Sequence, residues 1–96
     1  MPHMSLPGDH EPVTALRNLG PASAEWLRNV DIVTVGDLRK LGAVLAWKIV
    51  RQRHPEANLL LLHALHAALE DRHWQDLSKE EKDALKAEAD EPLGMR

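Results

Sequence analysis

Apolar residues recur at helical spacing along most of this chain, and the pattern breaks at glycines, prolines and polar capping residues. A stripe of Val13, Leu16 and Leu19 predicts a short first helix that starts near Pro12 and ends at Gly20. Later segments continue the same spacing and predict helices over residues 21–29, 35–41, 43–53 and 58–73, and from residue 79 onward. The chain is therefore predicted to be all-α.

The most apolar part of the sequence is NLLLLHALHAALEDRH, residues 58–73. Five of its apolar residues fall at helical spacing: Leu61, Leu62, Leu65, Ala68 and Leu69. Such density is typical of a helix that is packed on more than one side. We expect this helix to form the centre of the core, and the charged helix after Ser78, with Leu85 as its strongest apolar residue, to be largely solvated.

Composition limits the class of protein. A chain of 96 residues without Phe or Tyr must build a modest core from Leu, Val, Ala and three Trp, a choice that favours helices over sheets. It has no cysteine, no signal peptide and no apolar run of membrane-spanning length, so we expect a cytoplasmic protein. The predicted organisation is one small five- or six-helix domain over 12–91, with a disordered tail at 1–11 and a tail at 92–96.

The net charge of −3 is unevenly distributed. Residues 12–53 have seven basic and three acidic residues, a local charge of +4, whereas the rest of the chain has five basic and twelve acidic residues, a charge of −7. Nucleic acid responds to a local basic patch more than to the total charge. The basic half is therefore the region to consider for DNA contact.

A short motif occurs twice in this basic half. LRNLGPASA at 16–24 and LRKLGAVLA at 38–46 align with an offset of 22 residues. Each copy predicts a helix, a tight glycine corner and a second helix, with Gly20 and Gly42 both in the left-handed region that favours glycine. Duplicated units of this size bury their faces against each other. We expect the two units to pack around the apolar helix 58–73.

The residues of these motifs resemble known families. NLGPASAEWL is similar to a helix-hairpin-helix motif. LRNLGPASAEWL, VTVGDLRKLGAVLAW and NLLLLHALHAALEDRHWQDLS, in this order, resemble the C-terminal domain of the competence regulator TfoX (Sxy) over about residues 12–80. The resemblance implies a regulator of DNA-uptake genes that acts with a cyclic-AMP receptor type activator and has no enzymatic activity. Full-length family members have a separate N-terminal domain.

The helix-hairpin-helix resemblance also implies candidate binding residues. Such hairpins hold a phosphate through backbone N–H groups and nearby basic side chains. The candidates for DNA or partner binding are Arg17, Asn18, Gly20, Ser23, Arg39, Lys40 and Gly42. Asn18 and Gly20 match the two hairpin glycines, but Ala22 stands where DNA-binding hairpins often have Lys. Two functions remain open: contact with a protein partner, which we prefer, and sequence-neutral DNA binding.

Other chemistry finds little support in the sequence. No set of residues predicts a nucleophile, a phosphate loop, a cofactor site or a small-molecule substrate, so an enzyme is not expected. His63, His66 and His73 have helical spacing but lack the carboxylate or thiolate partners of a metal site. The three Trp are expected to pack in the core or at its edge. The alternative is that one of them anchors a protein partner.

Overall fold

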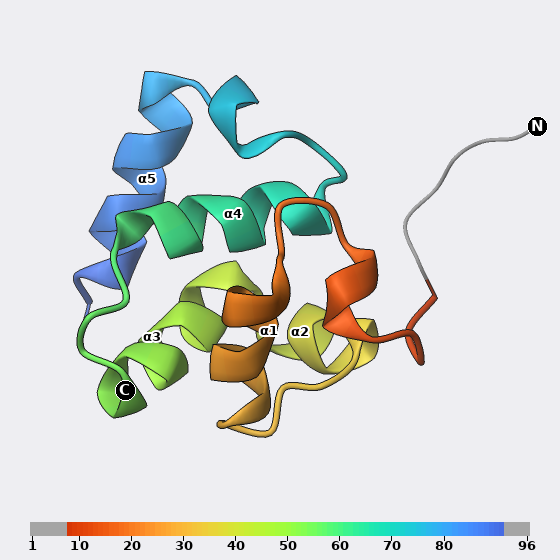
Figure 1. The fold of residues 1–96 in the computed structure, drawn as a ribbon. Coiled ribbons are helices and arrows are strands. Elements are labelled where there is room, and N and C mark those ends of the chain that lie inside the picture. Colours follow the sequence, from red (N-terminus) through yellow and green to blue (C-terminus); the bar gives the residue numbers. More distant parts are fainter. Residues whose placement is uncertain (1–7, 92–96) are drawn as a thin grey trace, which may run out of the picture.

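Helices supply the regular structure of residues 8–91, the part of the chain that the computed structural model describes (Figure 1). These residues form five α-helices and two 3₁₀ turns: η1 Val13–Ala15, α1 Pro21–Arg28, α2 Val35–Leu41, α3 Ala43–Arg53, α4 Leu59–Leu69, η2 Trp74–Asp76 and α5 Lys79–Ala89. The prediction of a small all-α domain is confirmed. No helix among residues 8–91 combines the length and apolarity that crossing a membrane would require.

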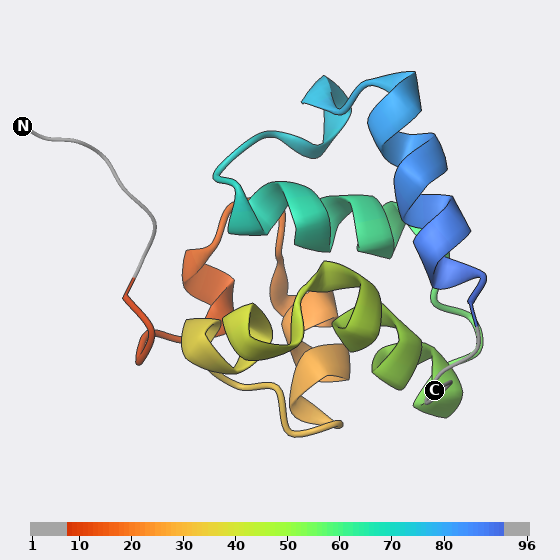
Figure 2. The same cartoon turned by 180° about the vertical axis from the view of Figure 1, so that it is seen from behind.

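The core centres on α3 and α4, and buried residues of η1, α1, α2 and α5 also contribute to it. Helix α3 contacts α1, α2, α4 and α5, whereas α5 stands at one end of the α3/α4 pair (Figure 1 and Figure 2). As predicted, α4 is deeply buried, and Leu62, Leu65 and Ala68 have no exposed surface. Leu69, also predicted to lie in the core, is only half-buried. Leu85 is the one buried residue of α5, so this helix is docked through a narrow contact, as its charged sequence predicts.

Local side-chain hydrogen bonds explain where three helices begin. Thr34 accepts from the backbone N–H of Asp37, and the Asp37 carboxylate accepts from the backbone N–H of Thr34. Ser78 and Glu81 form the same reciprocal capping box at α5. Asn58 accepts from the N–H of Leu60 at the start of α4. Each cap satisfies helix N–H groups that have no partner within the helix.

The predicted tail at 1–11 is wrong for residues 8–11, and residues 1–7 and 92–96 lie outside the described residues. The carbonyls of Asp9 and Glu11 accept from the N–H groups of Gly36 and Val35, both at 2.8 Å. These are the first two donors of α2, which its capping box leaves free. A Cβ on Gly36 would lie 3.0 Å from the Asp9 carbonyl oxygen, so the glycine allows this close approach.

The predicted first helix from Pro12 to Gly20 is also wrong. Only the turn Val13–Ala15 is helical, and the chain is extended at Leu16. The N–H of Val13 donates to the carbonyl of Val33, and Pro12 forms an isolated antiparallel bridge with Thr34. A helix of eight residues is marginal on its own, so these longer-range backbone contacts determine the conformation. The apolar stripe of Val13, Leu16 and Leu19 is buried even though the predicted helix does not form.

The two glycine corners are not equivalent, contrary to the prediction. Gly42 has φ 81° and ψ 163° and joins α2 directly to α3. Gly20 has φ −94° and ψ −172°, an extended conformation that any residue adopts. The reason is Pro21, since proline restricts the preceding residue to extended backbone. The left-handed residue of the first copy is instead Asn18, with φ 74°.

Candidate functional site

The first predicted corner is fastened to the segment after α4. Arg17 donates to the carbonyl of Asp71 at 3.0 Å and lies 3.7 Å from its carboxylate. The Asn18 amide donates to the carbonyl of Arg72 at 2.7 Å and accepts from the N–H of Trp74 at 3.3 Å. Arg17 and Asn18 therefore hold the fold together at the surface, between segments more than fifty residues apart in the chain.

The candidates of the second corner face a different part of the chain. Arg39 pairs with the Asp9 carboxylate beside the start of α2, and Lys40 is exposed on the same helix. Gly42 makes the corner between α2 and α3. The structure thus places Arg17 against the segment after α4 and Arg39 against the segment before η1. Both guanidinium groups have a carboxylate partner within the chain, which lowers the positive charge available to DNA.

Ser23 and Asn18, in contrast, line a surface groove of about 350 Å³ between α1, the start of α4 and η2. Its lining consists of apolar and neutral polar residues: Asn18, Ala22, Ser23, Trp26, Asn58, Leu60, Leu61, Ala64 and Trp74. None of these nine side chains is ionisable. The groove therefore presents an apolar floor with small hydrogen-bonding groups, a surface chemistry typical of protein contacts.

Contacts from three elements hold the walls of this groove. The indole of Trp26 stacks on His54, with ring centroids 5.6 Å apart. Trp74 is held by Asn18 through its backbone N–H. Leu60 lies in the first turn of α4, which Asn58 caps, and its side chain is 54% exposed. Trp26 and Trp74 are each half-buried, whereas Trp47 is buried in the core and donates its indole N–H to the carbonyl of Asn58.

Sequence reasoning missed Leu60. A signal for it was present, because four consecutive leucines cannot all lie on one face of a helix. Leu61, Leu62 and Leu65 fall on the buried face, and Leu60 is more than a quarter turn away from their centre. Trp26 and Trp74 match the expectation of edge packing. The sequence positions of Trp26, Leu60 and Trp74 do not indicate that these residues line one groove.

Apart from the groove, a cluster of charged residues joins α4 to α5. Arg72 donates to Glu70 at 2.8 Å, to both carboxylate oxygens of Glu81 at 2.6 and 2.9 Å, and to the carbonyl of Asp76 at 3.0 Å. The side-chain ligand atoms of His66, Glu70 and Glu81 lie within 4.8 Å of one another, a spacing that suits a metal ion. The Arg72 guanidinium already supplies the positive charge between the two carboxylates, so this cluster is an ion-pair site.

This cluster predicts acid sensitivity. The hydrogen bonds from Arg72, and then the N–H of Ser78, lower the pKa of Glu81 from 4.5 to about 2. The Glu81 carboxylate thus binds a proton more weakly in the folded state than in the unfolded state. The stabilisation from Glu81 is present above pH 4.5 and is lost as the pH falls from about 4.5 to about 2.

We therefore expect Glu81→Gln to destabilise the protein at neutral pH and to approach the parent chain in stability near pH 2. Urea unfolding of both proteins across this pH range measures the difference. Glu80→Gln, an exposed neighbour on α5, serves as the control and should lower the stability at neutral pH less than Glu81→Gln does. A Glu81→Gln deficit that is the same at every pH would contradict this account.

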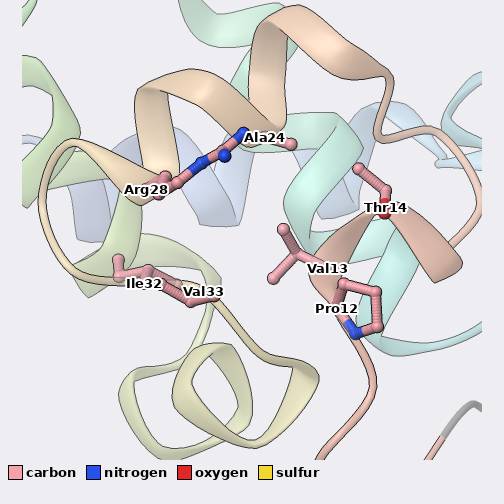
Figure 3. Close-up of a pocket in the computed structure, with 7 residues that line it drawn as sticks. All are labelled: Pro12, Val13, Thr14, Ala24, Arg28, Ile32 and Val33. Atoms are coloured by element: carbon pink, nitrogen blue, oxygen red, sulfur yellow. The ribbon is translucent and has the colours of Figure 1, made fainter.

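Another hollow lies on a different face of the domain, between η1, α1 and the segment before α2 (Figure 3). It encloses about 270 Å³, and its lining includes Val33, which is 45% exposed, and Arg28. The Arg28 side chain runs along α1 toward Ala24 and pairs with Glu25 at 3.3 Å. This hollow is smaller than the groove and has a charged wall.

Comparison with known proteins gives two matches. The sequence model of the TfoX C-terminal domain matches residues 9–89. The crystal structure of an uncharacterized protein from Listeria monocytogenes, in a triclinic form, is similar with a TM-score of 0.74 and 24% sequence identity. The similarity covers 78% of this chain and 85% of that one, and at this identity it supports the fold alone. No curated protein matches the chain significantly.

Proposed function

This chain belongs to the TfoX C-terminal domain family, and on that premise we propose that it is a non-catalytic regulatory module that acts through protein contact. Its proposed role is in the cytoplasm, in the transcriptional regulation of competence and DNA uptake, together with a cyclic-AMP receptor type activator. The family resemblance supplies this role. The surface of the described residues supports the mode of action.

The uncharged groove between α1, α4 and η2 is the observation that favours protein contact. Nucleic acid is bound chiefly through its phosphates, which require basic side chains along the contact surface. The groove offers none, and its lining instead includes the exposed Leu60 and two half-buried indoles. Indole and aliphatic groups in a hollow with a neutral polar edge are characteristic of protein interfaces.

Direct DNA binding is the second candidate, and one feature favours it. Helix α1 has Gly20 as its N-cap and therefore no side-chain cap, and because Pro21 has no N–H group, only the N–H groups of Ala22 and Ser23 in its first turn are free to meet a phosphate. The internal partners of Arg17 and Arg39 weaken this candidate, because a phosphate would have to displace Asp71 and Asp9.

Binding measurements with purified components distinguish the two candidates. We expect the labelled chain to bind the purified activator, measured by fluorescence anisotropy, with an affinity that neutralising Arg17, Arg39 and Lys40 leaves within about twofold. On a generic DNA duplex at low salt we expect no binding. Duplex binding that falls about tenfold or more in the neutralised variant and is lost on adding salt, without activator binding, would favour the DNA candidate and contradict the proposal.

A further inference from the structure

The imidazole of His63, on α4, has a buried ring nitrogen without a hydrogen-bond partner. Its Nδ1 atom is closed off from solvent, and no donor or acceptor among residues 8–91 reaches it. A protonated imidazole donates from both ring nitrogens, so protonation of His63 would place a charged N–H group here with nothing to accept it. The site therefore suits the neutral ring and disfavours the cation.

The charges around His63 act in the same direction. Among the described residues, those that act on it are Lys82 of α5 and His66 of its own helix. Helix α3 and η2 also pack against α4, but the buried residues of α3 are uncharged, and the carboxylate of η2, Asp76, is exposed. Burial, and then the charges of Lys82 and His66, lower the pKa of His63 below its ordinary value of 6.5.

The carboxylates near this contact are already engaged. Glu70 and Glu81 have oxygens within 4.8 Å of a ring nitrogen of His66, but both are paired with Arg72. The charge that His63 meets where α4 and α5 pack together is therefore positive.

Helix α5 is attached to the domain by few contacts. Leu85 is its one buried residue, and hollows of about 380 Å³ and 280 Å³ lie between α5 and α3 (Figure 2). The ion pair of Arg72 and Glu81 holds its first turn, and Lys48 donates to the carbonyl of Glu91 beyond its last turn at 2.7 Å. A buried, unpartnered charge at the α4 surface is costly compared with so narrow a contact.

We propose that α5 is a pH-dependent helix: protonation of His63 releases the turns after Glu81 from α4, while the first turn stays attached. The docked state binds the proton of His63 more weakly than the released state. Docking is therefore at full strength above about pH 6.5 and weakens as the pH falls below it. The ion pair of Arg72 and Glu81 weakens only below about pH 4.5, so it still holds the first turn when release occurs. The inference goes beyond the proposed function and does not depend on it.

Amide hydrogen exchange of the full chain at about pH 7.5 and about pH 5.5, corrected for the intrinsic pH dependence of exchange, tests this release. A proton bound by the released state alone weakens docking by up to about tenfold between these pH values. We therefore expect protection of the α5 amides after Glu81 to fall by about three- to tenfold, with a smaller fall in α2. A smaller fall in α5, or a fall in α2 as large as that in α5, would overturn the inference.

Substitutions of histidine assign the effect. His63→Gln keeps a polar side chain that does not titrate, and His63→Leu occupies the same position with an apolar one that needs no hydrogen bond. In both, the ratio of α5 protection at the two pH values should stay within about twofold of one. Each protein is compared with itself, so a general change in stability does not enter this ratio.

His10→Gln is the matched control, because His10 is exposed and lies in the segment before η1. This variant should keep the fall seen in the parent chain. A fall that persists in either His63 variant, or that disappears in His10→Gln, would show that His63 does not govern the docking of α5.

Discussion

Replacing Asn18 with alanine is expected to lower the free energy of unfolding by about 3–4 kcal/mol, and the thermal midpoint by about 12–30 °C. Two contributions combine. The left-handed backbone at φ 74° costs a residue with a Cβ and no polar side chain about 1–2 kcal/mol. The amide also makes two hydrogen bonds to the segment after α4, each worth about 1 kcal/mol. Thermal unfolding followed by far-ultraviolet circular dichroism measures the loss.

Asn18→Gly separates these contributions. Glycine adopts the left-handed conformation freely, so this variant should recover the backbone contribution and retain the loss of the two hydrogen bonds. In both variants the backbone N–H of Trp74 loses its partner, and we expect faster hydrogen exchange at this amide. An Asn18→Gly variant as unstable as Asn18→Ala would show that the backbone conformation contributes nothing. Unchanged exchange at Trp74 would show that the amide does not hold this wall of the groove.

The sequence predicted those parts of the fold that depend on nearby residues. The caps at Thr34, Asn58 and Ser78 each involve residues two or three positions away, and the helices that they begin start within one residue of the predicted positions. The apolar density of residues 58–73 predicted the burial of α4 because a helix with so many leucines has no stable solvated form. These features need no knowledge of the tertiary structure.

The conformation of residues 8–20 depends on partners far along the chain, and for these residues the predicted tail and first helix were wrong. Val13 is held by Val33, and Asp9 and Glu11 are held by the start of α2. The stripe of apolar residues is buried as its pattern predicts, but its spacing does not reveal that the backbone donors are satisfied outside a helix. Helical periodicity identifies a buried face more reliably than it identifies the conformation of a short segment.

The candidate site was also predicted only in part, because it too depends on residues that lie far apart in the chain. Asn18 is a residue that tolerates the left-handed conformation, and it does adopt it. Its side chain, expected to contact a phosphate or a partner, bonds instead to a segment that follows 54 residues later. The groove that it helps to form joins Trp26, Leu60 and Trp74 from three elements, and no local pattern brings these positions together.

The difference between the two repeat glycines leads to the second large prediction. Gly42→Ala is expected to lower the free energy of unfolding by about 1–3 kcal/mol, since φ 81° with ψ 163° is a region that glycine alone adopts readily. The thermal midpoint should fall by about 5–15 °C. No atom lies within 4 Å of a Cβ placed at this position, so the loss would come from backbone strain and not from a clash.

Gly20→Ala is the matched control, because the equivalent glycine of the first copy also has open space where a Cβ would lie, with no atom within 4 Å. Its φ of −94° suits alanine, and the lower entropy of the unfolded chain should make the change neutral or stabilising by up to about 1 kcal/mol. Thermal unfolding of the two variants side by side compares one substitution in two backbone conformations. Equal losses at both positions would mean that the corners are equivalent in solution and that Pro21 does not hold Gly20 in its extended form.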